Sequence, residues 1–272
     1  MYLKQRPIVY TLCGVDTIRA KKDSNSIRQR RRLVLQGLNH LLWPAVCANC
    51  RQNISETDNH LCGRCWAELL ENCGGHYCKR CGRDASEYGV VAGVCPDCQG
   101  KDFRFDQIAR AGVYSQSLRQ MILFFKKGRT ELDSVLSFLA NSALEGAGFY
   151  NEIELFVPVP LHWSRRLVRG YNQALIIARR LNHHKADVST ELVRIRRTRA
   201  QPTMTSPAAR ARNVAGAFSV RRGHPFAGRN VCLVDDIKTS GATLNECAKT
   251  LKQAEASKVF ALVLAVAGQK SG

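Results

Sequence analysis

The segment VCLVDDIKTSGATLNEC, residues 231–247, constrains the fold of this chain more than any other stretch. Its apolar run, Val231–Val234, is typical of a strand buried on both faces, as in parallel sheets. Two carboxylates, Asp235 and Asp236, follow directly, and a run of small residues then leads into a stretch with helical periodicity. The order predicts strand, loop and helix, with the acidic pair at the carboxyl end of the strand.

The small residues of this loop predict an anion site. Their backbone N–H groups and hydroxyls can close around a phosphate at the N-terminus of the following helix, where the dipole favours an anion. Carboxylates at the same sheet edge suit sugar hydroxyls or a Mg²⁺ ion held through water. Together they predict a site for a sugar 5-phosphate, although an acidic pair at a strand end also occurs in other α/β folds. The candidate phosphate ligands are Lys238, Thr239, Ser240, Gly241, Ala242 and Thr243.

The second half of the chain alternates between strand and helix patterns. Strands are predicted over residues 109–115, 154–160, 230–236 and 259–267, and helices over residues 117–128, 171–183 and 242–256. This alternation indicates an α/β fold with a parallel, doubly wound sheet.

A cysteine-rich module precedes that region. Nine of the 12 cysteines fall between Cys47 and Cys98, mostly as CxxC pairs, which favours reduced, metal-bound thiolates in a cytoplasmic protein over a disulfide scaffold. Four such pairs predict two closed S4 sites, each holding a structural zinc ion. The eight predicted ligands are Cys47, Cys50, Cys62, Cys65, Cys78, Cys81, Cys95 and Cys98.

Several properties of the cysteine module stay open. The pairs can combine sequentially or in an interleaved manner, and Cys73 and His76 lie between the two sets as alternative ligands. Zinc fits the spacing better than an iron–sulfur cluster, because the spacing is that of ribbons and not of ferredoxins. The module either holds a small fold together or also serves as a docking surface for DNA or protein.

The formal net charge of +19 indicates polyanionic partners or highly phosphorylated substrates. Residues 1–42 read as a basic N-terminal extension, centred on RAKKDSNSIRQRRR at residues 19–32, which is either a solvated tail or an arm that orders on an anionic surface. No apolar run is long enough to predict a membrane span.

Four segments resemble one known family. Residues 231–243 are similar to the phosphoribosyl pyrophosphate (PRPP) motif of type I phosphoribosyltransferases, with Lys238 where an apolar residue is usual. VPVPLHWSRRLVRGYNQA at 157–174, FFKKGR at 124–129 and QPTMTSPAARARNVAGAF at 201–218 resemble segments of the ComF/GntX family. Members of that family are competence protein F-like phosphoribosyltransferases with an N-terminal double zinc ribbon, and the resemblance covers roughly residues 43–268.

The resemblance implies a domain order and a chemistry. A double zinc ribbon is expected at residues 43–101, followed at residues 102–272 by a type I phosphoribosyltransferase-like domain with a Rossmann-like parallel sheet. It implies that PRPP binds with Mg²⁺ at Asp235 and Asp236, and that arginines recognise pyrophosphate through their planar forks. We expect those arginines to be Arg165, Arg166 and Arg169, with Arg169 among the catalytic residues.

Two functions fit this sequence. The first is Mg²⁺-dependent phosphoribosyl transfer to an unidentified acceptor, linked through the family to DNA uptake. The second is a PRPP-sensing or single-stranded-DNA-binding accessory protein without catalysis. Residues 162–222 hold 14 lysines and arginines against two acids, an excess that one pyrophosphate does not require, and His162 and Trp163 are candidates for stacking on a base.

Overall fold

The structure is a computed structural model, and it describes residues 45–55, 60–86, 89–91, 93–98, 100–198 and 206–267. The chain divides into two units, residues 1–44 and residues 45–272, and every described residue belongs to the second. The predicted basic extension at residues 1–42 therefore lies outside the described residues.

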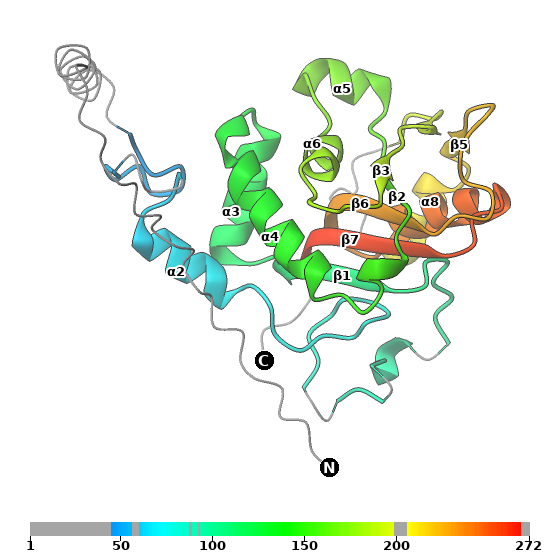
Figure 1. Cartoon of the computed structure of the whole chain (residues 1–272), viewed down its shortest axis with the longest axis horizontal. Coiled ribbons are helices and arrows are strands. Elements are labelled where there is room, and N and C mark those ends of the chain that lie inside the picture. The colour runs from blue at the N-terminus through cyan, green and yellow to red at the C-terminus, as the bar shows by residue number, and fades with distance from the viewer. Residues whose placement is uncertain are drawn as a thin grey trace, which may run out of the picture. The chain divides into compact units, whose positions relative to one another are not determined.

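A five-stranded parallel sheet forms the centre of the second unit (Figure 1). The strand order is β1-β7-β6-β2-β3, and every neighbouring pair in it is parallel. All eight residues of β7 are buried, as expected for a strand covered on both faces. The strands are β1 (Ile108–Val113), β2 (Leu155–Pro158), β3 (Asp187–Val188), β6 (Val231–Lys238) and β7 (Val259–Val266).

Helices cover both faces of this sheet. On one face, α3 (Gln116–Lys126), α4 (Asp133–Glu145) and α6 (Gln173–Arg179) share a hydrophobic cluster with alternate residues of β1, β6 and β7. On the other face, α8 (Ala242–Gln253) packs on the remaining residues of β6 and β7 through Leu244, Cys247 and Leu251. The predicted α/β class with a doubly wound parallel sheet is confirmed.

Smaller elements border the carboxyl ends of β2 and β6. Helix α5 (Trp163–Arg169) follows β2, and a two-stranded antiparallel sheet pairs β4 (Leu192–Arg194) with β5 (Phe218–Val220). Helix α7 (Pro207–Val214) packs against α8. Three short 3-10 helices complete the described elements: η1 (Pro96–Cys98), η2 (Thr130–Leu132) and η3 (Tyr150–Glu152).

The cysteine module packs on the sheet domain through both of its halves. Its helix α2 (Gly63–Glu71) lies against α3, and Trp66 meets Phe138 of α4 edge to face at 5.9 Å. Between the halves, Cys73 forms an antiparallel bridge with Gly112 of β1. The connecting segment therefore covers β1, which is an edge strand that would otherwise expose unpaired backbone groups.

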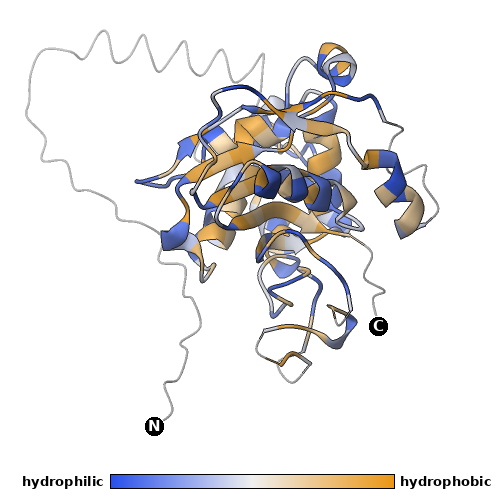
Figure 2. Cartoon of the chain, turned by 90° about the vertical axis from the view of Figure 1, so that its right-hand side faces the viewer, coloured by the Kyte–Doolittle hydropathy of each residue, from blue (hydrophilic) through white to orange (hydrophobic). Residues whose placement is uncertain are grey.

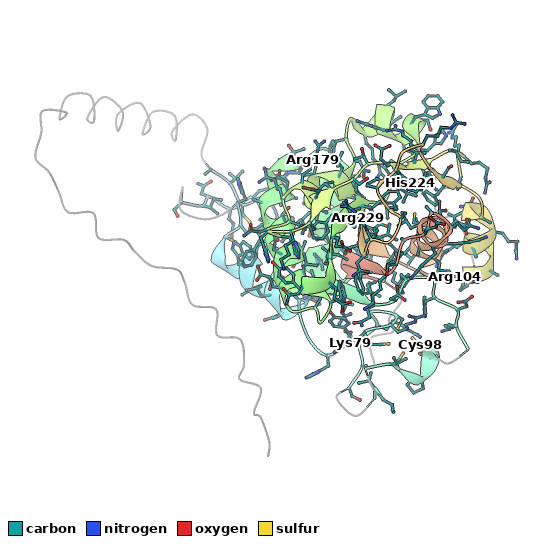
Figure 3. The ribbon with its side chains drawn as sticks, turned by 45° about the vertical axis from the view of Figure 1, so that its right-hand side comes forward. Lys79, Cys98, Arg104, Arg179, His224 and Arg229 are labelled. Atoms are coloured by element: carbon teal, nitrogen blue, oxygen red, sulfur yellow. The ribbon has the colours of Figure 1, made fainter. Side chains whose placement is uncertain are left out.

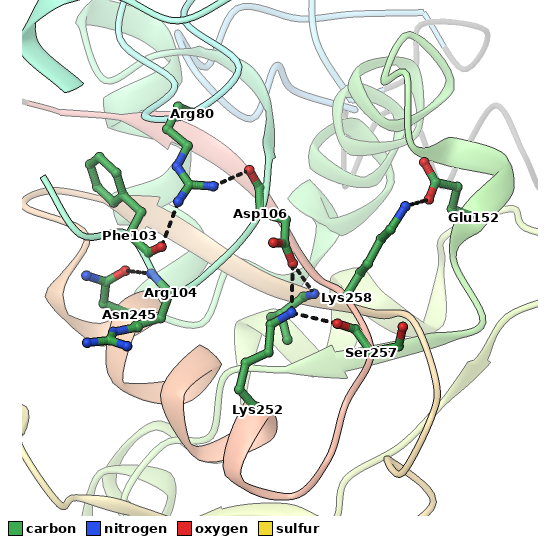
Figure 4. A network of polar contacts seen from close by, with 10 residues as sticks. Arg80, Phe103, Arg104, Asp106, Glu152, Asn245, Lys252, Ser257 and Lys258 are labelled. Carbon is green, nitrogen blue, oxygen red and sulfur yellow. Dashed lines mark hydrogen bonds and ion pairs between the residues drawn. The ribbon is translucent and has the colours of Figure 1, made fainter. Parts of the chain in front are cut away.

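A polar network fixes the segment that leaves the second half of the module (Figure 4). Arg80 donates to the carbonyls of Phe103 and Asp106, both at 2.8 Å, and the Asp106 carboxylate accepts from the backbone N–H of Val259 at 2.8 Å. Asn245, in the first turn of α8, accepts from the N–H of Arg104 at 2.9 Å. These bonds connect the module, through the segment that follows it, to the helix that follows the predicted phosphate loop.

Colouring by hydropathy shows the apolar layers of the sheet and the more polar cysteine module beside them (Figure 2).

Strand β6 extends to Lys238, two residues beyond the acidic pair, because Ile237 and Lys238 still pair with β7. The predicted strand ended at residue 236 with the acidic pair as its last residues, whereas in the structure the pair is followed by two further residues of the strand.

Candidate functional site

The eight CxxC cysteines form two compact clusters. The first contains Cys47, Cys50, Cys62 and Cys65, and the second contains Cys78, Cys81, Cys95 and Cys98, with all sulfurs of a cluster within 4.8 Å of one another. The pairs thus combine sequentially and not in an interleaved manner. Cys73 belongs to neither cluster, and its raised pKa of about 11, caused by burial, keeps it a neutral thiol.

The spacing of the sulfurs fits zinc. Cys50 and Cys62 lie 3.6 Å apart, as do Cys78 and Cys98, and Cys81 and Cys95 lie 3.7 Å apart. A tetrahedral ion with Zn–S bonds of about 2.3 Å requires edges of about 3.8 Å. The donor set and its geometry therefore suit two structural zinc ions.

One thiol in each cluster is prepared for deprotonation. Burial alone would raise the pKa of Cys47, but backbone N–H groups outweigh it and lower the pKa to about 6. The corresponding Cys78 has a pKa of about 7 for the same reasons. In both clusters one of the donating N–H groups belongs to the third cysteine, Cys62 at 3.3 Å and Cys95 at 3.2 Å, so the two halves repeat one local design.

A second candidate site lies at the carboxyl ends of β2 and β6. A cavity of about 410 Å³ opens there, within the range of roughly 300–1,000 Å³ that is typical of small-molecule sites. We call it the acidic-pair cavity. Its polar and charged lining residues include Lys126, Arg165, Arg169, Asn172, Gln173, Arg194, Asp235, Asp236, Thr239 and Thr243.

The two carboxylates have different partners. Asp236 pairs with the ammonium of Lys126 from α3 at 2.9 Å. Asp235 accepts the backbone N–H of Asp236 at 2.9 Å. Burial and the neighbouring Asp236 carboxylate raise the pKa of Asp235 to about 7, and Lys126 and Arg194 only partly offset this effect.

This acidic pair fits a divalent cation. Carboxylate oxygens are the ligands that Mg²⁺ prefers, and a positive ion would relieve the repulsion that raises the pKa of Asp235. The residues that would hold it are Asp235 and Asp236, directly or through water.

The loop after β6 has the predicted small residues and leads into α8. Gly241, at φ +82°, precedes the first residue of the helix, in a conformation that favours glycine. The side chains of Thr239 and Thr243 line the acidic-pair cavity, whereas Ser240, Gly241 and Ala242 do not. The Ser240 hydroxyl instead accepts the N–H of Ala242 at 3.4 Å.

Lys238 differs from its prediction. It was expected to donate to a phosphate, but its side chain is 5% exposed and does not line the cavity. Its ammonium lies 5.8 Å from the centre of the Phe103 ring, and its Cε approaches Gly241. Strict alternation along β6 would place Lys238 on the same face as Asp236, but its ammonium lies toward Phe103, and burial lowers its pKa.

The predicted arginines separate into two groups. Arg165 and Arg169 line the acidic-pair cavity, but Arg166 lines a different one described below. Helix α5 begins at Trp163, and its preceding residue His162 caps it by accepting the N–H of Ser164 at 3.3 Å. Because successive residues of a helix point about 100° apart, Arg165 and Arg166 cannot share one face.

Three residues of this cavity were not predicted as ligands. Lys126 lies in the FFKKGR segment, and Arg194 in an arginine-rich one, so the sequence signals their charge but not their direction. Gln173 is 2% exposed, and its side-chain amide nitrogen has no hydrogen-bond partner among the described residues. A buried unpaired donor beside a cavity is a candidate for binding a ligand oxygen.

Comparison with known proteins assigns two domains to the chain. Residues 38–99 match the double zinc ribbon domain, and residues 167–272 match the phosphoribosyl transferase domain. Within the described part of the chain, no helix is long and apolar enough to span a membrane.

Individual relatives cover most of the chain. It is 30% identical to competence protein F of Haemophilus influenzae, over 76% of this chain and 90% of that protein. It is 28% identical to the DNA utilization protein YhgH of Escherichia coli, over 80% of this chain and 96% of that protein. It is 26% identical to the competence protein ComFC of Bacillus subtilis, over 76% of this chain and 84% of that protein. A crystal structure of a hypoxanthine phosphoribosyltransferase from Staphylococcus aureus matches 53% of this chain and 71% of its own, with 11% identity and a TM-score of 0.30.

Proposed function

The chain belongs to the family of competence protein F, and from this premise we propose that its acidic-pair cavity binds PRPP with Mg²⁺ and transfers the phosphoribosyl group to an acceptor. One observation carries the proposal. The acidic pair lines a single cavity together with Thr239 of the loop before α8, Thr243 of the first turn of α8, and Arg165 and Arg169 of α5.

Each part of this cavity matches one part of PRPP. The loop at the N-terminus of α8 suits the 5-phosphate, because the helix dipole favours an anion there. Asp235 and Asp236 suit the ribose hydroxyls and Mg²⁺. Arg165 and Arg169 suit the pyrophosphate, and the two repel each other enough to lower the pKa of Arg165 beyond the effect of burial.

In the transfer, the acceptor's lone pair forms a bond to C1 of the ribose while the bond from C1 to the pyrophosphate oxygen breaks. The bonding electrons leave with the pyrophosphate, and the acceptor's proton passes to solvent. When bound, Mg²⁺ supplies charge stabilisation of that leaving group. The protein's own part is to position C1 and to neutralise the pyrophosphate with arginines, without a covalent nucleophile.

A second candidate function is binding without transfer, as a PRPP sensor or a single-stranded-DNA-binding accessory protein. The observation that favours it is the 14:2 excess of basic over acidic residues in residues 162–222, together with Trp163, which is 66% exposed. The relatives are named a competence protein and a DNA utilization protein, which supports a role of this chain in DNA uptake or utilization under either function.

Pyrophosphate release separates the two functions. We expect the zinc-loaded protein to release pyrophosphate from PRPP with a suitable member of an acceptor panel, and Asp235→Asn/Asp236→Asn to release none. Binding of PRPP without release, whichever free base, nucleotide or oligonucleotide is added, would favour the sensor function instead.

A further inference from the structure

A second cavity adjoins the acidic-pair cavity and has a different chemical character. It encloses about 360 Å³ between α5, α6 and the β4–β5 sheet. Four residues line both cavities, and they are Pro160, Leu161, Asn172 and Arg194. A molecule that fills the second cavity therefore has one end at the wall of the first.

This second cavity, here called the arginine cavity, is lined by four arginines and no carboxylate among the residues that the structure describes. The arginines are Arg166, Arg179, Arg194 and Arg221. They come from four separate elements or their flanks, so the fold, and not one helical repeat, brings their charges together. Figure 3 labels Arg179 in the upper part of the view and Cys98, of the second cysteine cluster, in the lower part.

Most of this positive charge is uncompensated. Arg221 has a loose contact with Glu191 at 3.8 Å, but within the described residues Arg166 and Arg179 make no ion pair. Arg194 donates to the Thr198 hydroxyl, yet its Nε is buried without a hydrogen-bond partner among the described residues. Burial lowers the pKa of Arg194 most, and repulsion from Arg165 lowers it further. A bound anion would offset both effects, because it would stabilise the charged guanidinium.

The remaining lining is suited to a flat ring. Leu161, Leu175 and Leu192 give the cavity apolar walls, and Trp163 of α5 lies at its edge with its side chain 66% exposed. An indole that is exposed beside several arginines can stack on a base while the arginines bind its phosphate. A free base or a small carboxylate would leave most of these arginines unpaired.

We propose that the arginine cavity binds the phosphate-bearing end of the acceptor, so that the acceptor is a nucleotide and not a free base. This inference rests on the proposed function. A hydroxyl or amine at the other end of the nucleotide reaches the shared wall at Arg194 and Asn172, where it forms the bond to C1 of PRPP. The bond from C1 to pyrophosphate breaks, the electron pair leaves with pyrophosphate, and the acceptor's proton passes to solvent.

The test is a calorimetric titration of the full-length, zinc-loaded protein with adenosine 5′-monophosphate, with adenosine as the probe that lacks phosphate. We expect the nucleotide to bind at least about tenfold more tightly than adenosine, because arginine–phosphate bonds are lost in the latter. Arg179→Gln should weaken nucleotide binding about tenfold, whereas Arg229→Gln, an exposed arginine outside both cavities, should leave it unchanged. Equal affinity for the two probes, or equal loss in both variants, would overturn the proposal.

Competition with PRPP shows which of the two cavities the nucleotide occupies. We expect it to bind equally well when PRPP and Mg²⁺ saturate the protein, and displacement by PRPP would place it in the acidic-pair cavity and contradict the proposal. The two failures are distinguishable: the proposed function fails if PRPP does not bind or releases no pyrophosphate, whereas this inference fails if the nucleotide does not bind beside PRPP. A ten-residue thymidine oligonucleotide, titrated with and without a 5′-phosphate, distinguishes the two sources of the phosphate. Tighter binding of the 5′-phosphorylated oligonucleotide would point to a strand end, and equal binding of both would point to a free nucleotide.

Discussion

The ammonium of Lys126 lies 2.9 Å from a carboxylate oxygen of Asp236, so the acidic pair carries its own counter-ion before any ligand binds. Both side chains are largely covered, at 21% and 16% exposure. Solvent therefore screens this pair less than a surface ion pair. The positive charge of Lys126 also stabilises the ionised form of Asp235.

Replacing Lys126 tests this relationship. We expect Lys126→Gln to raise the pKa of Asp235 further and to move the pH midpoint of PRPP binding upward by about half a unit to one unit. The measurement is PRPP affinity between pH 6 and 9. Lys127→Gln is the matched control, because Lys127 is exposed and does not line the cavity. A midpoint that moves equally in both variants would contradict a specific pairing.

The wild-type protein should bind PRPP in a pH-dependent manner. The pKa of Asp235 is about 7, so binding through Mg²⁺ requires loss of a proton below that pH. We expect the affinity to fall by up to about tenfold per pH unit below 7 and to level off above it. Asp235→Asn should bind weakly at every pH, and a flat wild-type profile from pH 6 to 8 would argue against the raised pKa.

The same carboxyl affects stability with a defined sign. An unfolded aspartate has a pKa of about 3.9, so between about pH 4 and pH 7 the folded chain holds the proton more tightly than the unfolded one. The contribution of Asp235 to the free energy of unfolding is thus present at low pH and is lost as the pH rises through 7. Comparing urea unfolding of the wild type and Asp235→Asn across this range measures it.

Zinc content distinguishes ligand from spectator cysteines. We expect the wild type to hold two zinc ions per chain, Cys62→Ser to lose one of them, and Cys73→Ser to keep both. Serine cannot supply the thiolate that closes the S4 site, whereas Cys73 lies in neither cluster. Metal analysis of the purified variants decides the matter, and two full equivalents of zinc in Cys62→Ser would refute the cluster assignment.

Gly112 is required where the cysteine module covers β1. A β-carbon there would collide with the backbone carbonyl oxygen of Asn72, whereas one at Gly148 would meet nothing within 4 Å. We expect Gly112→Ala to lower the free energy of unfolding by about 1–3 kcal/mol. Gly148→Ala should leave it unchanged or raise it slightly. Urea denaturation compares the two variants, provided that the dependence of the unfolding free energy on urea concentration is the same in both. Equal stability would show that the backbones of Asn72 and Gly112 can separate without cost.

Local patterns predicted the sheet and the metal ligands, because they depend on neighbours in sequence. The apolar run before Asp235 identifies a buried strand, and each CxxC pair already sets two ligands on one turn. The directions in which individual side chains point depend on tertiary structure and were less predictable. Lys238 turns toward Phe103 and Arg166 faces the second cavity, although their neighbours Thr239 and Arg165 line the first.

Residues that arrive from distant elements were missed for the same reason. Lys126 reaches Asp236 across 110 positions of sequence, and no local pattern specifies that α3 packs beside the end of β6. The sequential combination of the cysteine pairs was likewise open, because spacing alone permits both arrangements.

The most direct test of the central claim is calorimetric titration of the zinc-loaded protein with PRPP, with and without Mg²⁺, beside Asp235→Asn/Asp236→Asn. A circular dichroism spectrum identical to that of the wild type would show that the variant is folded. The account predicts Mg²⁺-dependent binding that weakens about 100-fold or more in the variant, as expected when two charged partners of the ligand are lost. Binding of equal strength in both proteins, or none at millimolar PRPP, would contradict it.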